Sequence, residues 1–364
     1  MIQPGSVVRM GAGWVKSSLV RYAVPLGFGV LCLLFSWASG LRWEFLADEV
    51  VSRLGRNALL VLSLILPVTA GLGLNFSIVI GAMAGQLGLI TVTHLRLGGP
   101  AGLALAAGIA TPLAVVLGFA AGAVLNRAKG KEMIASMILG FFSDGLYQLL
   151  LLFMVGSIIP VVDPDLLLAS GVGVRATIDL EAVSGALDHL LPIQVGSVSI
   201  PGANILVAGL IALAILLLGK TKLGQDMRAV GQDIHVAEMA GIRVDNVRTS
   251  ALILSTVLAS WGQIVFLQNI STLNTYYSHD QVGMFSIAAL LVGGATVFRA
   301  TWANAVVGIF LFHTLFVVAP FAGQNLMASP QIGEFFRVFA AYGIIAATLA
   351  VNARQRAEGI IRRT

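Results

Sequence analysis

Long apolar runs, each close to the length of a bilayer-spanning helix, constrain this sequence more than any other feature. A span needs about 20 apolar residues, and by that measure ten runs qualify. The mean hydropathy is +0.92 and only 11% of residues are charged, which is too little polar surface for a soluble globular domain. The sequence therefore predicts an all-α integral membrane protein of ten transmembrane helices, at 22–40, 58–74, 76–93, 101–125, 133–159, 201–218, 248–267, 283–298, 302–322 and 334–351.

The distribution of Lys and Arg predicts the orientation. With both termini inside, sixteen of the 22 basic residues fall on the inner side and five on the outer side. Basic loops collect on the cytoplasmic side of a membrane, which also explains the basic excess without nucleic acid as a partner. We expect residues 1–21 to be a cytoplasmic segment, 22–352 the membrane domain, with its first run kept as an uncleaved helix, and 353–364 a cytoplasmic tail.

The longest outer loop, 161–200, carries five acidic residues against one arginine. Within it, residues 180–191 have the pattern of a short amphipathic helix that would lie on the outer membrane face. The acidic loop either meets an extracytoplasmic protein or is simply solvated.

The second and third runs are nearly continuous. Pro67, Gly71 and Gly73 interrupt them, so this pair is either two spans or a broken, re-entrant helix. Residues 72–89 and 287–308 are both rich in glycine and interrupted by polar residues, which indicates an internal repeat of five spans each.

A polar island at 221–248 separates two apolar runs and contributes to the cytoplasmic charge. Asp233 is suited to capping the first turn of a helix and Gly241 to ending it. The helix between them is short, and it places Ile234, Ala237 and Met239 near one side and His235 and Glu238 on another. Such an element needs a partner surface to be stable.

Polar residues inside the predicted spans are candidates for a solute pathway. Asp144 is the only acid well inside a span, and Tyr147 and Gln148 share its helical face. An ionisable group in hydrocarbon needs a wet cavity or a partner. Asn75 with Ser77, and Asn304, are further candidates. Each of these side chains has the alternative of a purely structural hydrogen bond between helices.

The sequence lacks the motifs of the common catalytic sites. There is no phosphate-binding G-x-x-x-x-G-K-[ST] loop, no HExxH or GxSxG motif, and no Cys/His cluster. We therefore expect no enzymatic activity, no cofactor and no metal in this chain. If ATP drives its function, another polypeptide must bind ATP and Mg²⁺.

The segment LGQDMRAVGQDIHVAEMAGIRVDNVR resembles the cytoplasmic coupling segment of permeases in bacterial ABC importers of the ribose, autoinducer-2 and nucleoside group. The stretch LLVGGATVFRATWANAVVGIF is similar to their glycine-containing stretch near the C-terminal end. NFSIVIG, from Asn75 onward, lies where these permeases have a broken helix beside the pathway, but it matches neither their sugar-type nor their nucleoside-type sequences. The residues that match the coupling pattern or lie within its helix are Arg228, Gly231, Asp233, Ile234, His235, Ala237, Glu238, Met239 and Gly241.

This resemblance implies a multi-pass permease of the bacterial inner membrane. Its expected partners are two ABC ATPase subunits docked on the coupling helix, a second permease subunit, identical or related, and an extracytoplasmic substrate-binding protein. The expected cargo is a sugar, a nucleoside or a similar small polar solute. An ion-coupled secondary transporter and a membrane scaffold without transport activity are the alternatives.

Overall fold

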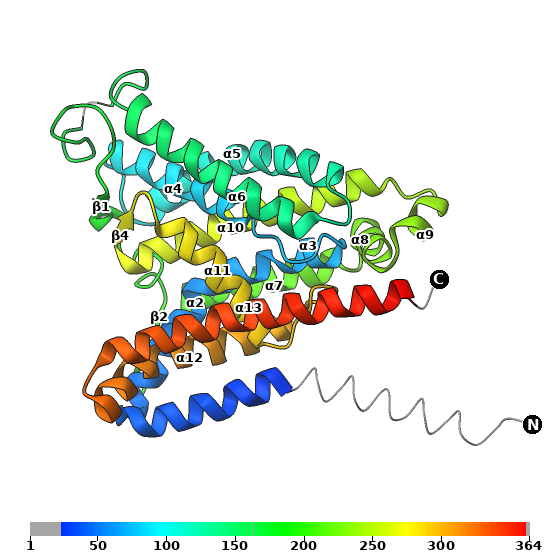
Figure 1. The fold of residues 1–364 in the computed structure, drawn as a ribbon. Helices are drawn as coiled ribbons and strands as arrows, with labels where there is room; N and C mark the ends of the chain where they lie inside the picture. The colour runs from blue at the N-terminus through cyan, green and yellow to red at the C-terminus, as the bar shows by residue number, and fades with distance from the viewer. Residues whose placement is uncertain (1–22, 162, 362–364) are drawn as a thin grey trace, which may run out of the picture.

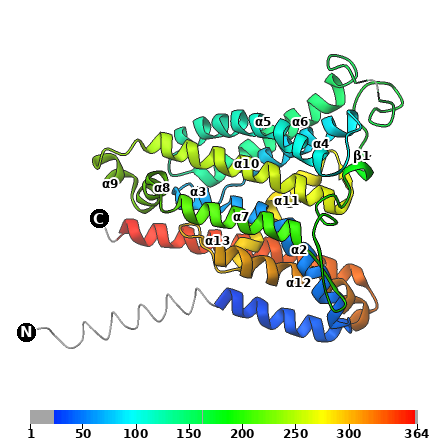
Figure 2. The same ribbon diagram turned by 180° about the vertical axis from the view of Figure 1, so that it is seen from behind.

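The computed structural model describes residues 23–161 and 163–361, so the predicted segment 1–21 and residues 362–364 lie outside the described part of the chain. Long helices run side by side in a bundle (Figures 1 and 2). The two short helices of the 221–248 segment lie at one end. Two small strand pairs and the long loop before residue 200 lie at the other end, so the two predicted sides of the membrane correspond to opposite ends of the bundle.

The elements follow the apolar runs. The first helix is Ala23–Ser39. The others are α2 (Trp43–Ser63), α3 (Ile65–Thr69), α4 (Ile78–His94), α5 (Gly99–Arg127), α6 (Glu132–Leu149, continued by a π-helical turn at Leu150–Met154), α7 (Gly202–Leu218), α8 (Lys222–Gln232), α9 (Ile234–Met239), α10 (Val244–Ile270), α11 (Ser278–Val292), α12 (Trp302–Met327) and α13 (Pro330–Ile361). The strands β1 (Thr177–Asp179) and β4 (Thr272–Asn274) pair antiparallel, as do β2 (Pro192–Val195) and β3 (Val198–Pro201).

Six helices of the described residues are long and apolar enough to cross a membrane, and a seventh span results if α7 and α8, bent by 75°, are counted together. The chain is therefore an all-α, multi-pass membrane protein. The ten-span count, the placement of both termini inside and the five-plus-five repeat stay predictions. The predicted tail, 353–364, continues α13 as far as Ile361.

The predicted span at 58–74 is wrong in its position. The helical stretch begins at Trp43 and ends at Thr69. It includes Arg53 and Arg56, which the charge count places in an outer connection, because both side chains have hydrogen-bond partners. Arg53 donates to Glu49 at 2.7 Å, and Arg56 donates to Asn269 of α10 at 2.7 Å. The chain between Ala70 and Ser77 is non-helical, so the predicted interruption of this region is present.

The predicted amphipathic helix at 180–191 is also wrong, because only Glu181–Val183 is helical, as a 3₁₀ turn. Hydrogen bonds to the bundle hold the rest of this stretch in turns. The Asp188 carboxylate accepts from the side-chain amides of Asn204 in α7 and Asn269 in α10. The loop is thereby attached to the outer ends of two helices.

Helix α10 lies at the centre of the bundle and packs on α5, α4 and α2. Small residues allow its close contact with α4: a Cβ at Gly81 or Gly85 would meet the backbone of Thr256 or Ser260. Helix α2 packs in turn against α12 and α11. Thus a helix from each half of the chain packs against helices of the other half.

Candidate functional site

The segment 221–248, which we call the coupling segment after the family segment that it resembles, folds from local signals, as its sequence predicts. Thr221 caps α8 by accepting from the Gly224 amide. Asp233 ends α8 and caps α9, its carboxylate accepting from the amides of His235 at 2.9 Å and Val236 at 3.2 Å. Gly241 follows α9 with a φ of +80°, the left-handed conformation that glycine adopts most readily. These residues give two short helices joined at a sharp corner.

The inner side of the coupling segment packs on the interrupted helix. Met227, Val230 and Ala237 are buried together with Ala70 and Leu72. At Gly231 the two backbones touch, since a Cβ there would clash with the Thr69 carbonyl oxygen, and a Cβ at Gly71 would lie 3.0 Å from the Gly231 Cα. The segment is therefore in direct contact with the interruption at 70–77.

The outer side of α9 is exposed and partly apolar. Met239 is 81% exposed and Val236 is 57% exposed, while His235 and Glu238 beside them are also exposed. The prediction that Met239 lies near the same side as Ala237 is wrong: Ala237 is buried and Met239 is exposed, because residues two positions apart on a helix do not face the same way. Exposed methionine and valine at the end of a membrane protein form a candidate docking surface.

Charged pairs connect the coupling segment to the neighbouring helix ends. Lys129, between α5 and α6, lies 2.8 Å from Asp245 and 3.6 Å from Glu238. The hydrogen bond to Asp245 raises the pKa of Lys129. Arg248 and Glu132 form a buried pair at 2.8 Å, and Arg228 donates to the carbonyl oxygen of Gly219. These contacts join α8, α9 and α10 to the ends of α5, α6 and α7.

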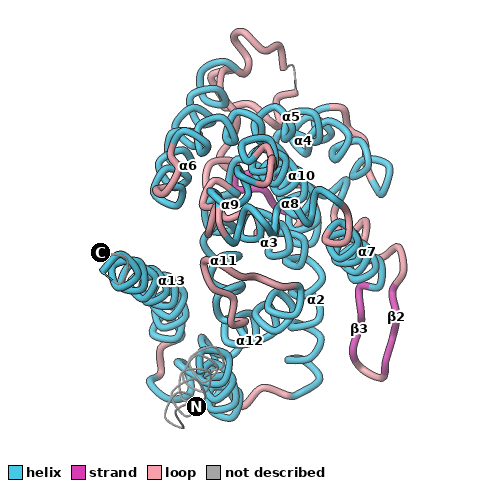
Figure 3. Tube along the Cα trace, turned by 90° about the vertical axis from the view of Figure 1, so that its right-hand side faces the viewer, coloured by secondary structure: helices cyan, strands magenta, loops and turns pink. Residues whose placement is uncertain are grey.

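Two adjoining cavities extend along one face of α6. One has a volume of about 220 Å³ and is bounded by α6, α11 and Tyr342 of α13; the other has about 330 Å³ and reaches Lys131 and Glu132 at the end of α6 nearest the coupling segment. Phe76 of the interruption and Met137 of α6 line both. Figure 3, which looks along the bundle from the α8–α9 end, shows α6 and α13 on either side of α11. Both cavities thus lie between α6 and the interruption at 70–77.

The predicted pathway residues Asn75, Ser77 and Asn304 are all hydrogen-bonded, and of these Asn75 and Ser77 are buried while Asn304 is partly buried. Asn75 and Ser77 are each 2% exposed, and the Asn75 side-chain oxygen accepts from the Ser77 amide and hydroxyl. Asn304 forms a capping box with Thr301 at the start of α12 and donates to the Gly293 carbonyl oxygen at 2.7 Å. Asn75 and Ser77 thus hold the backbone of the interruption at 70–77, and Asn304 holds the connection between α11 and α12. Phe76, in contrast, lines the cavities.

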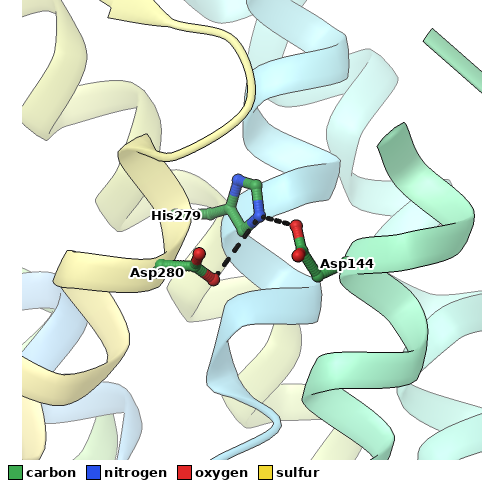
Figure 4. A group of neighbouring side chains, drawn as sticks. All are labelled: Asp144, His279 and Asp280. Atoms are coloured by element: carbon green, nitrogen blue, oxygen red, sulfur yellow. Dashed lines mark hydrogen bonds and ion pairs between the residues drawn. The ribbon is translucent and has the colours of Figure 1, made fainter. Parts of the chain in front are cut away.

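Asp144, Tyr147 and Gln148 belong to a polar cluster that joins α6 to α4 and α11. Gln148 donates to both oxygens of Asp144, at 3.2 and 3.0 Å. The Tyr147 hydroxyl donates to the side-chain oxygen of Gln86 at 2.8 Å, and His279 lies 2.9 Å from Asp144 (Figure 4). Of this cluster, the sequence predictions include the α6 members and omit Gln86 and His279.

The sequence gives only a weak indication that His279 and Gln86 belong to this cluster. His279 and Asp280 precede the apolar run at 283–298 and look like loop residues, although they form the first turn of α11. Gln86 stands alone among small and apolar residues. Asp280 and Phe76 both line the 220 Å³ cavity, and the sequence predictions include neither.

The similarity of this chain to characterised proteins is partial along its length. It is 33% identical over 108 residues to the autoinducer 2 import system permease protein LsrC of Yersinia enterocolitica, covering 28% of this chain and 29% of that protein. It is 29% identical over 153 residues to the nucleoside ABC transporter permease protein NupC of Lactococcus lactis, covering 42% of this chain and 46% of that protein. The chain thus covers less than half the length of these relatives, and no solved structure matches it significantly.

A family model described as branched-chain amino acid transport system, permease component, matches residues 47–348. The match includes the interruption at 70–77, the segment 221–248 and all residues that line the two cavities except Leu349. Both relatives named above are permease proteins by name, one of an autoinducer 2 import system and one of a nucleoside ABC transporter. The chain therefore belongs to this family of transport-system permease components.

Proposed function

We propose that this chain is the permease subunit of an ABC importer in the bacterial inner membrane. It takes up a small polar solute, such as a sugar or a nucleoside, along the cavities between α6, α11 and α13. Separate ATPase subunits bind ATP and Mg²⁺ and dock on α9. A second permease subunit and an extracytoplasmic binding protein complete the complex, and this chain itself has no enzymatic activity.

The contact between Gly231 and the interruption at 70–77 is the observation that carries the proposal. Gly231 touches Thr69 and Gly71 backbone to backbone, and Leu72, Gly73 and Phe76 of the same interruption line the cavities. Backbone contacts of this kind leave little room for independent movement. A displacement of α8 would therefore move the wall of the pathway, which is what coupling to an ATPase requires.

The surface of α9 is suited to receive that displacement. Met239 and Val236 project from the outer side of a helix whose inner side is buried. Methionine adapts its shape to a partner surface, and the neighbouring ion pairs of Lys129 keep the helix attached to α10 and the α5–α6 connection. An ATPase subunit bound here would transmit force to the bundle instead of to a loose loop.

A second candidate function is ion-coupled secondary transport, which the intramembrane cluster of Asp144 and His279 favours. Such a transporter would use a proton or sodium gradient and would work without an ATPase. The contact of the coupling segment with the cavity wall has no role in that mechanism, so we place it second.

Co-purification tests the proposal. The full chain is extracted from its native host in mild detergent, and associated ATPase subunits are quantified. We expect stoichiometric ATPase with the unmodified chain and loss of it in Met239→Glu. Met327→Glu is the matched control, because Met327 is 62% exposed at the opposite end of the bundle. Absence of any ATPase, or equal recovery with Met239→Glu, would reject the proposed docking.

A further inference from the structure

The cluster around His279 has the form of a cation site. His279 is fully buried in the first turn of α11, and its Nε2 atom lies 2.9 Å from an oxygen of Asp144 and 3.7 Å from an oxygen of Asp280. One ligand atom from each of the three residues falls within 4.8 Å of the others. Figure 4 shows the imidazole between the two carboxylates, which come from α6 and α11.

The opposite side of the imidazole has a defined partner. The Nδ1 atom lies 3.1 Å from the side-chain oxygen of Gln86, a fully buried residue of α4. The Tyr147 hydroxyl donates to the same oxygen at 2.8 Å. Within the described residues, the Gln86 oxygen is the acceptor for that hydroxyl. With the amide assigned so that its oxygen faces the ring, the proton of His279 is assigned to Nδ1.

This tautomer leaves the Nε2 lone pair directed at two carboxylates. Three electron-rich atoms that converge in this way repel one another unless a positive charge lies between them. A ligating histidine commonly donates its second N–H to an oxygen that fixes the orientation of the ring, as Gln86 does here. One imidazole nitrogen and two carboxylates suit Zn²⁺ and similar divalent transition metals, whereas Mg²⁺ and Ca²⁺ prefer oxygen ligands alone.

We propose that Asp144, His279 and Asp280 bind one divalent transition-metal ion of the zinc class. Asp280 is half-exposed and lines the 220 Å³ cavity, so the ion reaches the site from the cavity. Three protein ligands leave a coordination position open toward the cavity, where a carboxylate or hydroxyl group of a solute can bind. The ion also links α6 to α11 beside the pathway. The proposal is independent of whether an ATPase drives transport.

The experiment uses the purified full chain with an affinity tag that contains no histidine, stripped of metal by a chelator. Co²⁺ is titrated and followed by its visible absorption, and Zn²⁺ by calorimetry. We expect one ion per chain and a Co²⁺ spectrum with nitrogen and oxygen ligands. Asp280→Asn should abolish binding, and because its side chain is 46% exposed the variant should still fold, as checked by gel filtration.

Tyr147→Phe provides a finer test, because it removes only the hydroxyl that orients Gln86. Loss of such an outer partner weakens metal binding about 10- to 100-fold. Asp165→Asn, which changes an exposed carboxylate of the outer loop, is the control and should bind as the unmodified chain does. Absence of both the Co²⁺ absorption and the heat of Zn²⁺ binding, or binding that Asp280→Asn leaves unchanged, would overturn the proposal and leave the three residues as a hydrogen-bonded contact between α6 and α11.

Discussion

The substitution Gly231→Ala changes the contact between the coupling segment and the interrupted helix by a single methyl group. The added Cβ would clash with the carbonyl oxygen of Thr69. This oxygen belongs to the backbone at the end of α3, so it has no rotamer that would relieve the clash. The two chains must separate by a fraction of an ångström, and the variant therefore loosens the connection between α8 and the interruption at 70–77.

The size of the effect follows from two opposing terms. Overpacking a tight contact costs about 1–3 kcal/mol, and replacing a helical glycine by alanine returns about 0.5–1 kcal/mol. The net cost lies between about 0 and 2.5 kcal/mol, and its midpoint of about 1.3 kcal/mol corresponds to a change of about 10-fold in an equilibrium. If this contact transmits coupling, solute uptake should fall by about that factor while ATPase binding through the distant Met239 surface is kept.

The assay measures solute uptake and ATP hydrolysis by the same reconstituted complex. Gly209→Ala in α7 is the matched control, because its Cβ would meet no atom within 4 Å, and we expect uptake to be unchanged. Gly71→Ala should reproduce the defect for two reasons: its Cβ would lie 3.0 Å from the Gly231 Cα, and the φ of +75° at Gly71 is strained for alanine. Uptake by Gly231→Ala equal to that of Gly209→Ala, with ATP hydrolysis equally unaffected, would refute the role of this contact.

Two further predictions concern the charged pairs. Arg248→Met leaves the buried Glu132 carboxylate without its partner and should lower the free energy of unfolding by about 3–5 kcal/mol, whereas Arg248→Met with Glu132→Leu should recover most of it; a single variant as thermostable as the unmodified chain would contradict this. Lys129→Met should lower the free energy of unfolding by less than about 1 kcal/mol, because the pair is exposed, and Tm should fall slightly. Because the pKa of Lys129 is raised in the folded state, this contribution is fully present below the ordinary lysine value of 10.5 and is lost as pH rises through the raised pKa. A Tm difference that grows in alkali would be inconsistent with it.

Local signals explain why α9 was predictable. Asp233 accepts from amides two and three residues later, and Gly241 adopts its left-handed conformation within the same turn. Both interactions depend on residues close in sequence. The start of α2 was not predictable in this way, because the position of Arg56 inside a helix depends on Asn269, which lies more than 200 residues away.

The candidate pathway shows the same division. Asp144, Tyr147 and Gln148 share a face because of helical spacing, which the sequence reveals. Their partners His279 and Gln86 come from α11 and α4, and only the packing of these helices brings them together. Asn75 is predicted as a pathway residue because it is polar, yet its neighbour Phe76 lines the cavities and Asn75 does not. The non-helical backbone at 70–77 determines which of these side chains points toward the cavities.

Uptake by proteoliposomes tests the central claim most directly. The complex is reconstituted without ion gradients, and radiolabelled solute is followed with and without ATP, for the unmodified chain and for Met239→Glu. The account predicts accumulation that requires ATP and disappears in Met239→Glu together with the bound ATPase. Accumulation by the permease alone, or uptake driven by an ion gradient without ATP, would contradict it.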